Sequence, residues 1–241
     1  MKGTNVKRTR RGVQIEMALR RHGGRREGAG REPNVPGRPE VPHRTRGVLS
    51  RSKPLLITCK LLKEVGCIRG RRAVARIVAR IAIAKDRFGV RIIEYSIQSD
   101  HLHLIVESMD AVALARAMKG LSVRIARALN RLLGRRGQVF ADRYHHRVLG
   151  TPRQVRHALG YVLCNARKHR VAPPRAGWLD PCSSAPSFPG FAALATNESA
   201  RVTSLPTCWL LTTGWRRHGP LDPDHVPGAM QSPSPIAAAS T

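Results

Sequence analysis

The seven residues from His101 to Glu107, HLHLIVE, constrain the fold of this chain most strongly. Their pattern predicts a β-strand, on which side chains alternate between two faces. His101 and His103 would then share one face with Ile105. The opposite face would carry Leu102, Leu104 and Val106. Two imidazoles side by side on a rigid strand can act as a pair of metal ligands, or they can be ordinary strand histidines. The run alone leaves both interpretations open.

Further strands and helices are predicted on both sides of this run. The predicted strands are residues 55–62, 90–98, 101–107 and, after a turn, part of 138–149; the predicted helices are 70–87, 110–133 and 151–168. Ser99-Asp100 is a short turn signal, so the second and third strands form an antiparallel hairpin. The order β-α-β-β-α-β-α predicts an α+β fold. We expect a ferredoxin-like βαββαβ sheet with two helices on one face and an added C-terminal helix.

The charge of the chain is extreme. Its 241 residues include 43 Lys and Arg against 15 Asp and Glu, which gives a net charge of +28. Such a field favours an acidic polymer as the partner, and arginine is well suited to bidentate contacts with phosphate. The composition therefore predicts nucleic-acid binding.

The cysteines and the hydropathy exclude several classes of protein. The five cysteines are scattered and form no Cys-x-x-Cys pair, which argues against a zinc ribbon or a redox motif. No apolar run reaches the roughly 18 residues that a membrane span requires. The basic N-terminus lacks the apolar core of a signal peptide. We expect a cytoplasmic, nucleoid-associated protein with reduced thiols and no membrane partner.

Composition divides the chain into three parts. Residues 1–53 are rich in Gly, Pro and Arg and predict a flexible basic arm, either a solvated linker or a segment that wraps nucleic acid. Residues 54–170 contain the periodic segments and predict the folded domain. Residues 171–241 predict a C-terminal extension with a Trp/Arg flap and a disordered end. The tryptophans of this flap could stack on unpaired bases or pack on the core.

The helix predicted at 151–168 carries the polar residues that are hardest to explain by packing. Tyr161 and Asn165 are four residues apart and would share one helical face. A helical tyrosine taken alone is more often a core residue, and an asparagine is more often solvated. Their occurrence together with the histidine pair favours a common site.

Several stretches together resemble the single-tyrosine HUH transposases, and in particular the REP-associated tyrosine transposases. The run SDHLHL from Ser99 resembles the family's Asn-His-x-His-Leu signature, and GQVFADRY from Gly137 resembles its Gly-x-Leu-Phe/Trp-Gln-x-Arg-Phe/Tyr segment. Tyr161-x-x-x-Asn165 resembles the nucleophile helix, and GRREGAGR from Gly24 resembles an N-terminal motif of these proteins. The core resemblance covers roughly residues 54–170.

The resemblance implies a metal-dependent DNA strand transferase. His101, His103 and Asn165 would hold Mg²⁺ or Mn²⁺, Asp100 would orient His101, and Tyr161 would attack the scissile phosphate to give a 5′-phosphotyrosine link. The substrate would be single-stranded DNA beside a hairpin formed by a palindromic repeat. Some relatives act as dimers that share active sites, so a homodimer is one expectation. Asp100 stands where the family commonly has Asn, and Ala166 stands where many relatives have Pro.

The resemblance and the charge leave further alternatives. The residues expected to contact nucleic acid are Arg25, Arg26, Arg31, Arg143, Arg167, Lys168, Arg216 and Arg217. Tyr144 and Tyr95 remain alternative nucleophiles. A non-catalytic nucleic-acid-binding protein, derived from a transposase that has been domesticated or has decayed, is the alternative function. A structural RNA-binding protein would leave the histidine pair, Tyr161 and Asn165 unexplained.

Overall fold

The computed structural model describes residues 48–228, except 170, 172, 174, 193, 195, 198 and 199. All of these residues belong to one compact unit, Glu40–Thr241. Most of the basic arm predicted at residues 1–53 lies outside the described residues, and so do Arg25, Arg26 and Arg31. Within the part of the chain that is described, no helix is long and apolar enough to cross a membrane.

The centre of the molecule is an antiparallel sheet with the strand order β2-β3-β4-β1-β5. The strands are β1 (Leu55–Lys60), β2 (Asp86–Arg87), β3 (Val90–Ile97), β4 (His101–Ser108) and β5 (His145–Val148). A register shift between Ile92 and Glu94 keeps Ile92 and Tyr95 in one core, because an extra residue in one strand changes which side chains share a face. The predicted α+β class and its antiparallel hairpin are confirmed. The ferredoxin-like assignment stays a prediction.

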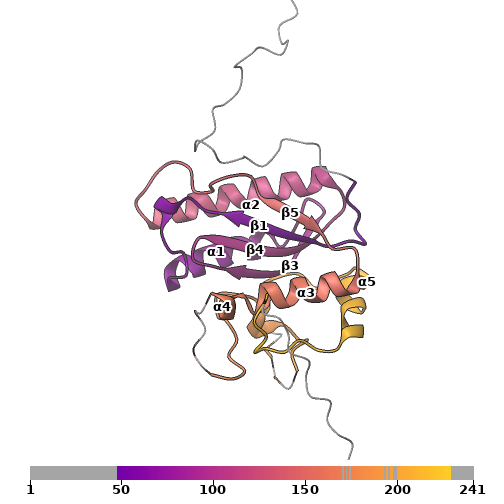
Figure 1. The fold of residues 1–241 in the computed structure, drawn as a ribbon. Coiled ribbons are helices and arrows are strands. Elements are labelled where there is room, and N and C mark those ends of the chain that lie inside the picture. Colours follow the sequence, from indigo (N-terminus) through magenta and orange to yellow (C-terminus); the bar gives the residue numbers. More distant parts are fainter. Residues whose placement is uncertain are drawn as a thin grey trace, which may run out of the picture. The chain divides into compact units, whose positions relative to one another are not determined.

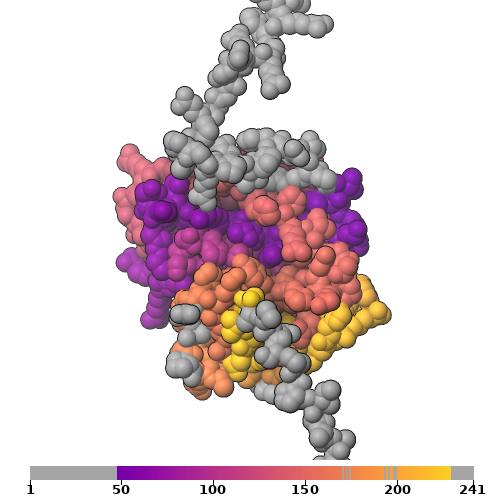
Figure 2. Space-filling model, viewed as in Figure 1, coloured from indigo at the N-terminus to yellow at the C-terminus, as the bar shows by residue number. Residues whose placement is uncertain are grey.

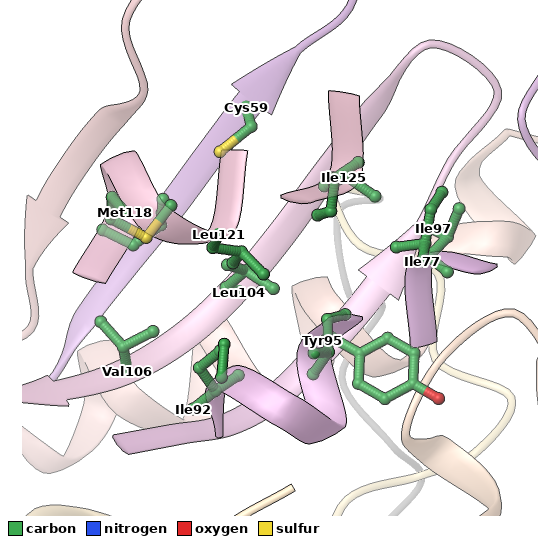
Figure 3. Close-up of a cluster of buried hydrophobic side chains, with 14 of the residues drawn as sticks. Cys59, Ile77, Ile92, Tyr95, Ile97, Leu104, Val106, Met118, Leu121 and Ile125 are labelled. Atoms are coloured by element: carbon green, nitrogen blue, oxygen red, sulfur yellow. The ribbon is translucent and has the colours of Figure 1, made fainter. Parts of the chain in front are cut away.

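One face of the sheet packs against α1 (Arg71–Ala84) and α2 (Ala111–Leu132), as Figure 1 shows. Asp110 caps α2 by accepting a hydrogen bond from the Ala113 amide at 2.8 Å. The core between the helices and the sheet is almost entirely apolar, and Figure 3 shows part of it. It includes Ile57, Ile77, Ile81, Leu102, Leu104, Val106, Leu114, Met118, Leu121 and Ile125.

The other face of the sheet packs against α3 (Pro152–Leu163) and the C-terminal extension (Figure 1). Thr151 caps α3, and Pro152 takes its first position as predicted. The described residues of the extension include the short helices η2 (Ala185–Ser187), α5 (Trp209–Thr212) and η4 (Gly214–His218). The second core includes Ile93, Ile105, Val155, Leu159, Val162, Phe188, Phe191, Trp215 and Leu221. The described part of the extension therefore supplies side chains to the second hydrophobic core.

The structure corrects three predicted boundaries. The helix predicted at 151–168 breaks at Cys164, so that Asn165 lies in a separate short helix, α4 (Asn165–Lys168). The strand predicted within 138–149 is only β5, and a two-residue strand replaces the end of the helix predicted at 70–87. Phe88 and Gly89 adopt positive φ angles of 57° and 73° at the turn from β2 to β3. Gly89 suits this turn because glycine has no Cβ to clash there.

Candidate active site

The histidine pair lies on β4 and faces α3. Leu102, Leu104 and Val106 belong to the core under α1 and α2, whereas Ile105 belongs to the core under α3. The alternation predicted from the sequence is therefore confirmed. The rings of His101 and His103 have their centroids 4.6 Å apart in an edge-on arrangement. Two imidazoles thus meet on the sheet face that the C-terminal half of the chain covers.

His103 is buried and held from one side. The side chain of Thr58, directly opposite it on β1, places Oγ1 3.0 Å from the Nδ1 atom of His103. The other ring nitrogen, Nε2, has no hydrogen-bond partner among the described residues. Burial, together with the nearby His101, His169 and Lys168, lowers the pKa of His103 to about 3. The ring is therefore neutral at physiological pH, which is the form that binds metal ions.

His101 is oriented by its chain neighbour. Its Nδ1 atom lies 2.7 Å from Oδ1 of Asp100. The hydrogen bond to His101 lowers the pKa of Asp100, so this carboxylate stays charged well below neutral pH. A carboxylate on one ring nitrogen fixes the orientation of an imidazole and raises its basicity as a ligand. Asp100 is thus placed for the supporting role that was predicted for it.

Tyr161 lies in α3 against the histidine pair. Its ring centroid is 4.9 Å from that of His103, and Nζ of Lys168 is 5.4 Å from the same tyrosine ring. Burial raises the pKa of the Tyr161 phenol. In the free protein the tyrosine is therefore protonated, and a cation near its oxygen would be needed to favour the phenolate.

The other two tyrosines pack in the core on the opposite face of the sheet. Tyr95 is buried there, and burial raises its pKa to about 12. Tyr144 packs against the same core, with its ring near that of His146. The chain has three tyrosines, and Tyr161 is the one whose ring lies against the histidine pair. This arrangement favours Tyr161 over the two alternative nucleophiles.

Asn165 is the most unusual buried residue of the site. It is 0 % exposed, and neither its Oδ1 nor its Nδ2 atom has a hydrogen-bond partner within the described part of the chain. Leaving a buried amide unsatisfied costs about 1–3 kcal/mol, so such groups in native proteins call for a functional explanation. In the chain, Asn165 stands four residues after Tyr161 and four residues before His169. The ring of Tyr161 contacts His103, and the ring centroid of His169 is 5.7 Å from that of His101.

His169 is a member of this cluster that the sequence analysis did not select. Burial lowers its pKa, and the charges of His101 and Lys168 act in the same direction. The signal in the sequence is its spacing, because Tyr161, Asn165 and His169 recur every four residues. The helix breaks at Cys164, and the rings of Tyr161 and His169 nevertheless both contact the histidine pair, with the buried Asn165 between them in the chain.

The residues present fit a divalent metal ion. His103 offers a neutral ring with an unpartnered nitrogen, and Asn165 offers a buried amide oxygen without a partner. Imidazole and amide oxygen are both ligands that Mn²⁺ accepts, whereas Mg²⁺ prefers oxygen more strongly. The described residues contain no cluster of three His, Cys, Asp or Glu side chains suited to a metal. The predicted set is consistent with this finding, because its third donor is an amide.

A groove of about 640 Å³ lies beside Tyr161. One wall comes from β1, β5 and α3, and the other from the C-terminal residues His225, Pro227 and Gly228. Its lining includes Arg147, Arg153 and His157 and no carboxylate. The groove therefore offers positive charge along a path that ends at the tyrosine.

The remaining residues predicted to bind nucleic acid lie in different settings. Lys168 is at the site, and Arg143 is exposed before β5. Arg216 and Arg217 stack on Trp215 and Trp209, at 4.9 and 4.8 Å from the ring centroids. Trp215 is a core residue, so this tryptophan packs on the core, whereas Trp209 is half exposed and its stacking on bases stays a prediction. The guanidinium of Arg167 is occupied by hydrogen bonds within the protein.

Comparison with known proteins concerns the part of this site formed by His101, His103 and Tyr161. No curated protein matches the chain. A solved structure of a REP-associated tyrosine transposase bound to a REP hairpin is similar, with 16% sequence identity, coverage of 60% of this chain and 82% of that chain, and a TM-score of 0.43. Residues 63–162, which include His101, His103 and Tyr161, match the family model described as IS200-like transposase. The matched stretch is 100 of the 241 residues, and over it the chain is similar to the IS200-like transposase family.

Proposed function

We propose that the protein is a metal-dependent DNA strand transferase that cleaves and rejoins single-stranded DNA at hairpin-forming repeats through Tyr161. The observation that carries this proposal is the contact between the rings of Tyr161 and His103, with unpartnered buried atoms on both His103 and Asn165. A half-buried tyrosine beside the unpartnered imidazole of His103, four residues before an unsatisfied buried amide, is poorly explained by packing alone. The similarity of residues 63–162 to the IS200-like transposase family model supports the same activity.

In this proposal His101, His103 and Asn165 hold Mg²⁺ or Mn²⁺, and Asp100 keeps His101 oriented. The ion supplies Lewis-acid polarisation of the scissile phosphate. Tyr161 attacks phosphorus through its phenol oxygen, the bond from phosphorus to the 3′ oxygen breaks, and a 5′-phosphotyrosine and a free 3′-hydroxyl result. Attack by a second 3′-hydroxyl on this ester reverses the step and joins strands without ATP.

Lys168 supports the tyrosine in this role. Its ammonium lies 5.4 Å from the centroid of the Tyr161 ring, and a positive charge at that distance favours the phenolate over the phenol. Lys168 would therefore both stabilise the attacking oxygen and attract the phosphate.

The basic groove is the proposed path of the DNA strand. Arg147 and Arg153 can neutralise phosphates on the way to Tyr161, and backbone contacts of this kind carry no sequence information. The stacked pair of Trp209 and Arg217 offers an exposed aromatic surface for an unpaired base, and Arg216 and Arg143 add charge. The contact between Tyr161 and His103 is made within one chain. A homodimer stays a prediction.

A denaturing gel tests the proposed reaction. The protein is incubated with a panel of hairpin oligonucleotides carrying single-stranded flanks, with Mn²⁺ or with EDTA. We expect an adduct that survives denaturation with Mn²⁺ and none with EDTA or in the Tyr161→Phe variant. Tyr144→Phe serves as the matched control and should retain the adduct. Salt-sensitive DNA binding without an adduct in any metal would instead support the non-catalytic alternative.

A further inference from the structure

The last described segment of the chain follows the helix that carries Tyr161. We name residues 219–228 the strap. Arg156 donates hydrogen bonds to the carbonyls of Gly219 and Pro220, at 3.3 and 2.8 Å. The Sγ atom of Cys164 lies 3.7 Å from the Asp222 carbonyl oxygen. The residue earlier in the helix contacts the start of the strap, and the later one contacts a later strap residue, so the two segments run in the same direction.

The strap is itself anchored in the second core. Leu221 is buried there and forms a bridge with Phe191, and backbone hydrogen bonds join it to Gly190 and Ala192. His225 packs over Gly160, where an added Cβ would lie 3.4 Å from the histidine ring. In Figure 2 the yellow residues of the C-terminal segment lie against the orange residues around α4. The strap is therefore a fixed support for α3 and α4.

Arg167 joins α4 to this support. Its Nε atom donates to the Pro223 carbonyl at 2.9 Å, and its Nη2 atom donates to the Trp178 carbonyl at 3.2 Å and to the carboxylate of Asp224. The same carboxylate accepts hydrogen bonds from the Gly177 amide at 2.9 and 3.1 Å. One guanidinium and one carboxylate thus hold three chain segments together.

The short helix α4 depends on such contacts. It has four residues, and helices of one turn are not stable by themselves. Nevertheless it carries the buried Asn165 and leads directly into His169, whose ring contacts that of His101. It also carries Lys168, which lies at the Tyr161 ring. Arg167 is the one arginine within α4, and its neighbours on both sides face the site or the core.

We propose that Arg167 and Asp224 are positioning residues that hold α4, so that Asn165 keeps its buried place between Tyr161 and His169, the two residues whose rings contact the histidine pair. This inference rests on the proposed function, in which Asn165 is a metal ligand. It assigns a role to the strap, which lies outside the stretch that matches the family model. It also replaces the DNA contact predicted for Arg167 with a role inside the protein.

Hydrogen exchange of the metal-free protein tests the structural half of this inference. Asp224→Ala removes the carboxylate, and Asp86→Ala is the matched control, since Asp86 is also a partly exposed partner of an arginine, at 3.7 Å. We expect the amides of His169 and Val171, which close α4, to exchange at least about tenfold faster in Asp224→Ala only. If Asp224→Ala does not fold, Asp224→Asn is used. Unchanged exchange at both amides would overturn the inference.

Mn²⁺ affinity tests the functional half. We expect Asp224→Ala to bind Mn²⁺ about tenfold more weakly than the wild type, because residues that orient metal ligands typically contribute 10–100-fold. The same substitution in an Asn165→Ala background should cause no further loss, because the effect acts through Asn165. Losses that multiply in the double variant would overturn this assignment.

The outcomes separate this inference from the proposed function. If the wild type and His103→Ala bind Mn²⁺ equally, the proposed metal site is wrong. If the wild type binds Mn²⁺ through His103 and Asp224→Ala binds it just as tightly, the proposed function stands and the positioning role of Arg167 and Asp224 is wrong.

Discussion

The two faces of the sheet are built on different principles. The face under α1 and α2 is filled with aliphatic side chains, and the pattern of these residues follows strand and helix periodicity closely. The face under α3 contains apolar residues as well, but it also buries His103, Asn165, Glu94 and Glu107. Glu107 accepts hydrogen bonds from the backbone at Thr207 and Cys208, and Glu94 pairs with Arg201. His103 and Asn165 keep unpartnered atoms.

The comparison teaches where stability and chemistry reside in this fold. Buried ion pairs such as Arg69–Asp180 and Glu94–Arg201 hold the extension on the sheet, whereas His103, which contacts the Tyr161 ring, and Asn165, four residues after Tyr161, carry buried atoms without a partner among the described residues. Unsatisfied polar atoms cost stability and persist at functional sites. We therefore expect substitutions on the α1/α2 face to change folding and substitutions around Tyr161 to change activity.

The largest expected effect is the loss of activity in His103→Ala. We expect adduct formation to fall at least about 100-fold, because the variant removes a proposed metal ligand. His145→Ala is the control, since His145 is an exposed strand histidine. Adduct formation on a hairpin oligonucleotide with Mn²⁺ is measured after the melting temperatures have been compared. Equal activity of the two variants would contradict the claim that the face under α3 carries the chemistry.

The next effect concerns the α1/α2 face. Leu104 is 1 % exposed in the core of that face, in the same cluster as Leu102 and Val106 of its own strand and residues of α2. We expect Leu104→Ala to lower the free energy of unfolding by about 3 kcal/mol, the usual cost of such a cavity. Urea denaturation followed by circular dichroism measures this change. A loss below about 1 kcal/mol would show that this face is packed more loosely than the structure indicates.

A smaller effect is expected for single phosphate contacts. Arg153→Gln removes one charge from the groove beside Tyr161, and Arg76→Gln removes one from the exposed side of α1. We expect Arg153→Gln to reduce the slope of log K against log [salt] for single-stranded DNA by about 0.7, the value for one phosphate contact. Arg76→Gln should leave the slope unchanged. Titrations over a range of salt concentrations test both variants, and equal slopes would contradict the proposed path.

The smallest expected change is the stability of Asn165→Ala. The substitution removes an amide that makes no hydrogen bond within the described structure, so the free energy of unfolding should change by less than about 1 kcal/mol in the absence of metal. The same variant should lose most of its Mn²⁺ affinity. Urea denaturation and Mn²⁺ titration measure the two quantities. A large loss of stability without metal would assign Asn165 a structural role instead.

Local patterns made much of this architecture predictable. The stripes of α1 and α2, the alternation around His103 and the cap at Asp110 follow from periodicity and short-range chemistry. The placement of Tyr161 beside the histidine pair required the resemblance to a family in addition, because spacing shows which residues share a helical face but not what that face contacts.

Long-range contacts made the rest unpredictable. Cys164, where the helix breaks, and Arg167 both contact strap residues more than 50 positions later in the chain. Nothing in the local sequence of α4 indicates that its arginine meets Asp224. Trp215 likewise belongs to the core because η4 packs against α3. The local sequence around this tryptophan was equally compatible with base stacking.

The most direct test of the central claim is the identity of the modified residue. The protein is reacted with a hairpin oligonucleotide and Mn²⁺, digested with nuclease and protease, and the peptides are sequenced by mass spectrometry. We predict that the remaining nucleotide is attached through its 5′ phosphate to Tyr161. A nucleotide on Tyr144 or Tyr95, or a 3′-phosphate linkage at any residue, would contradict the account.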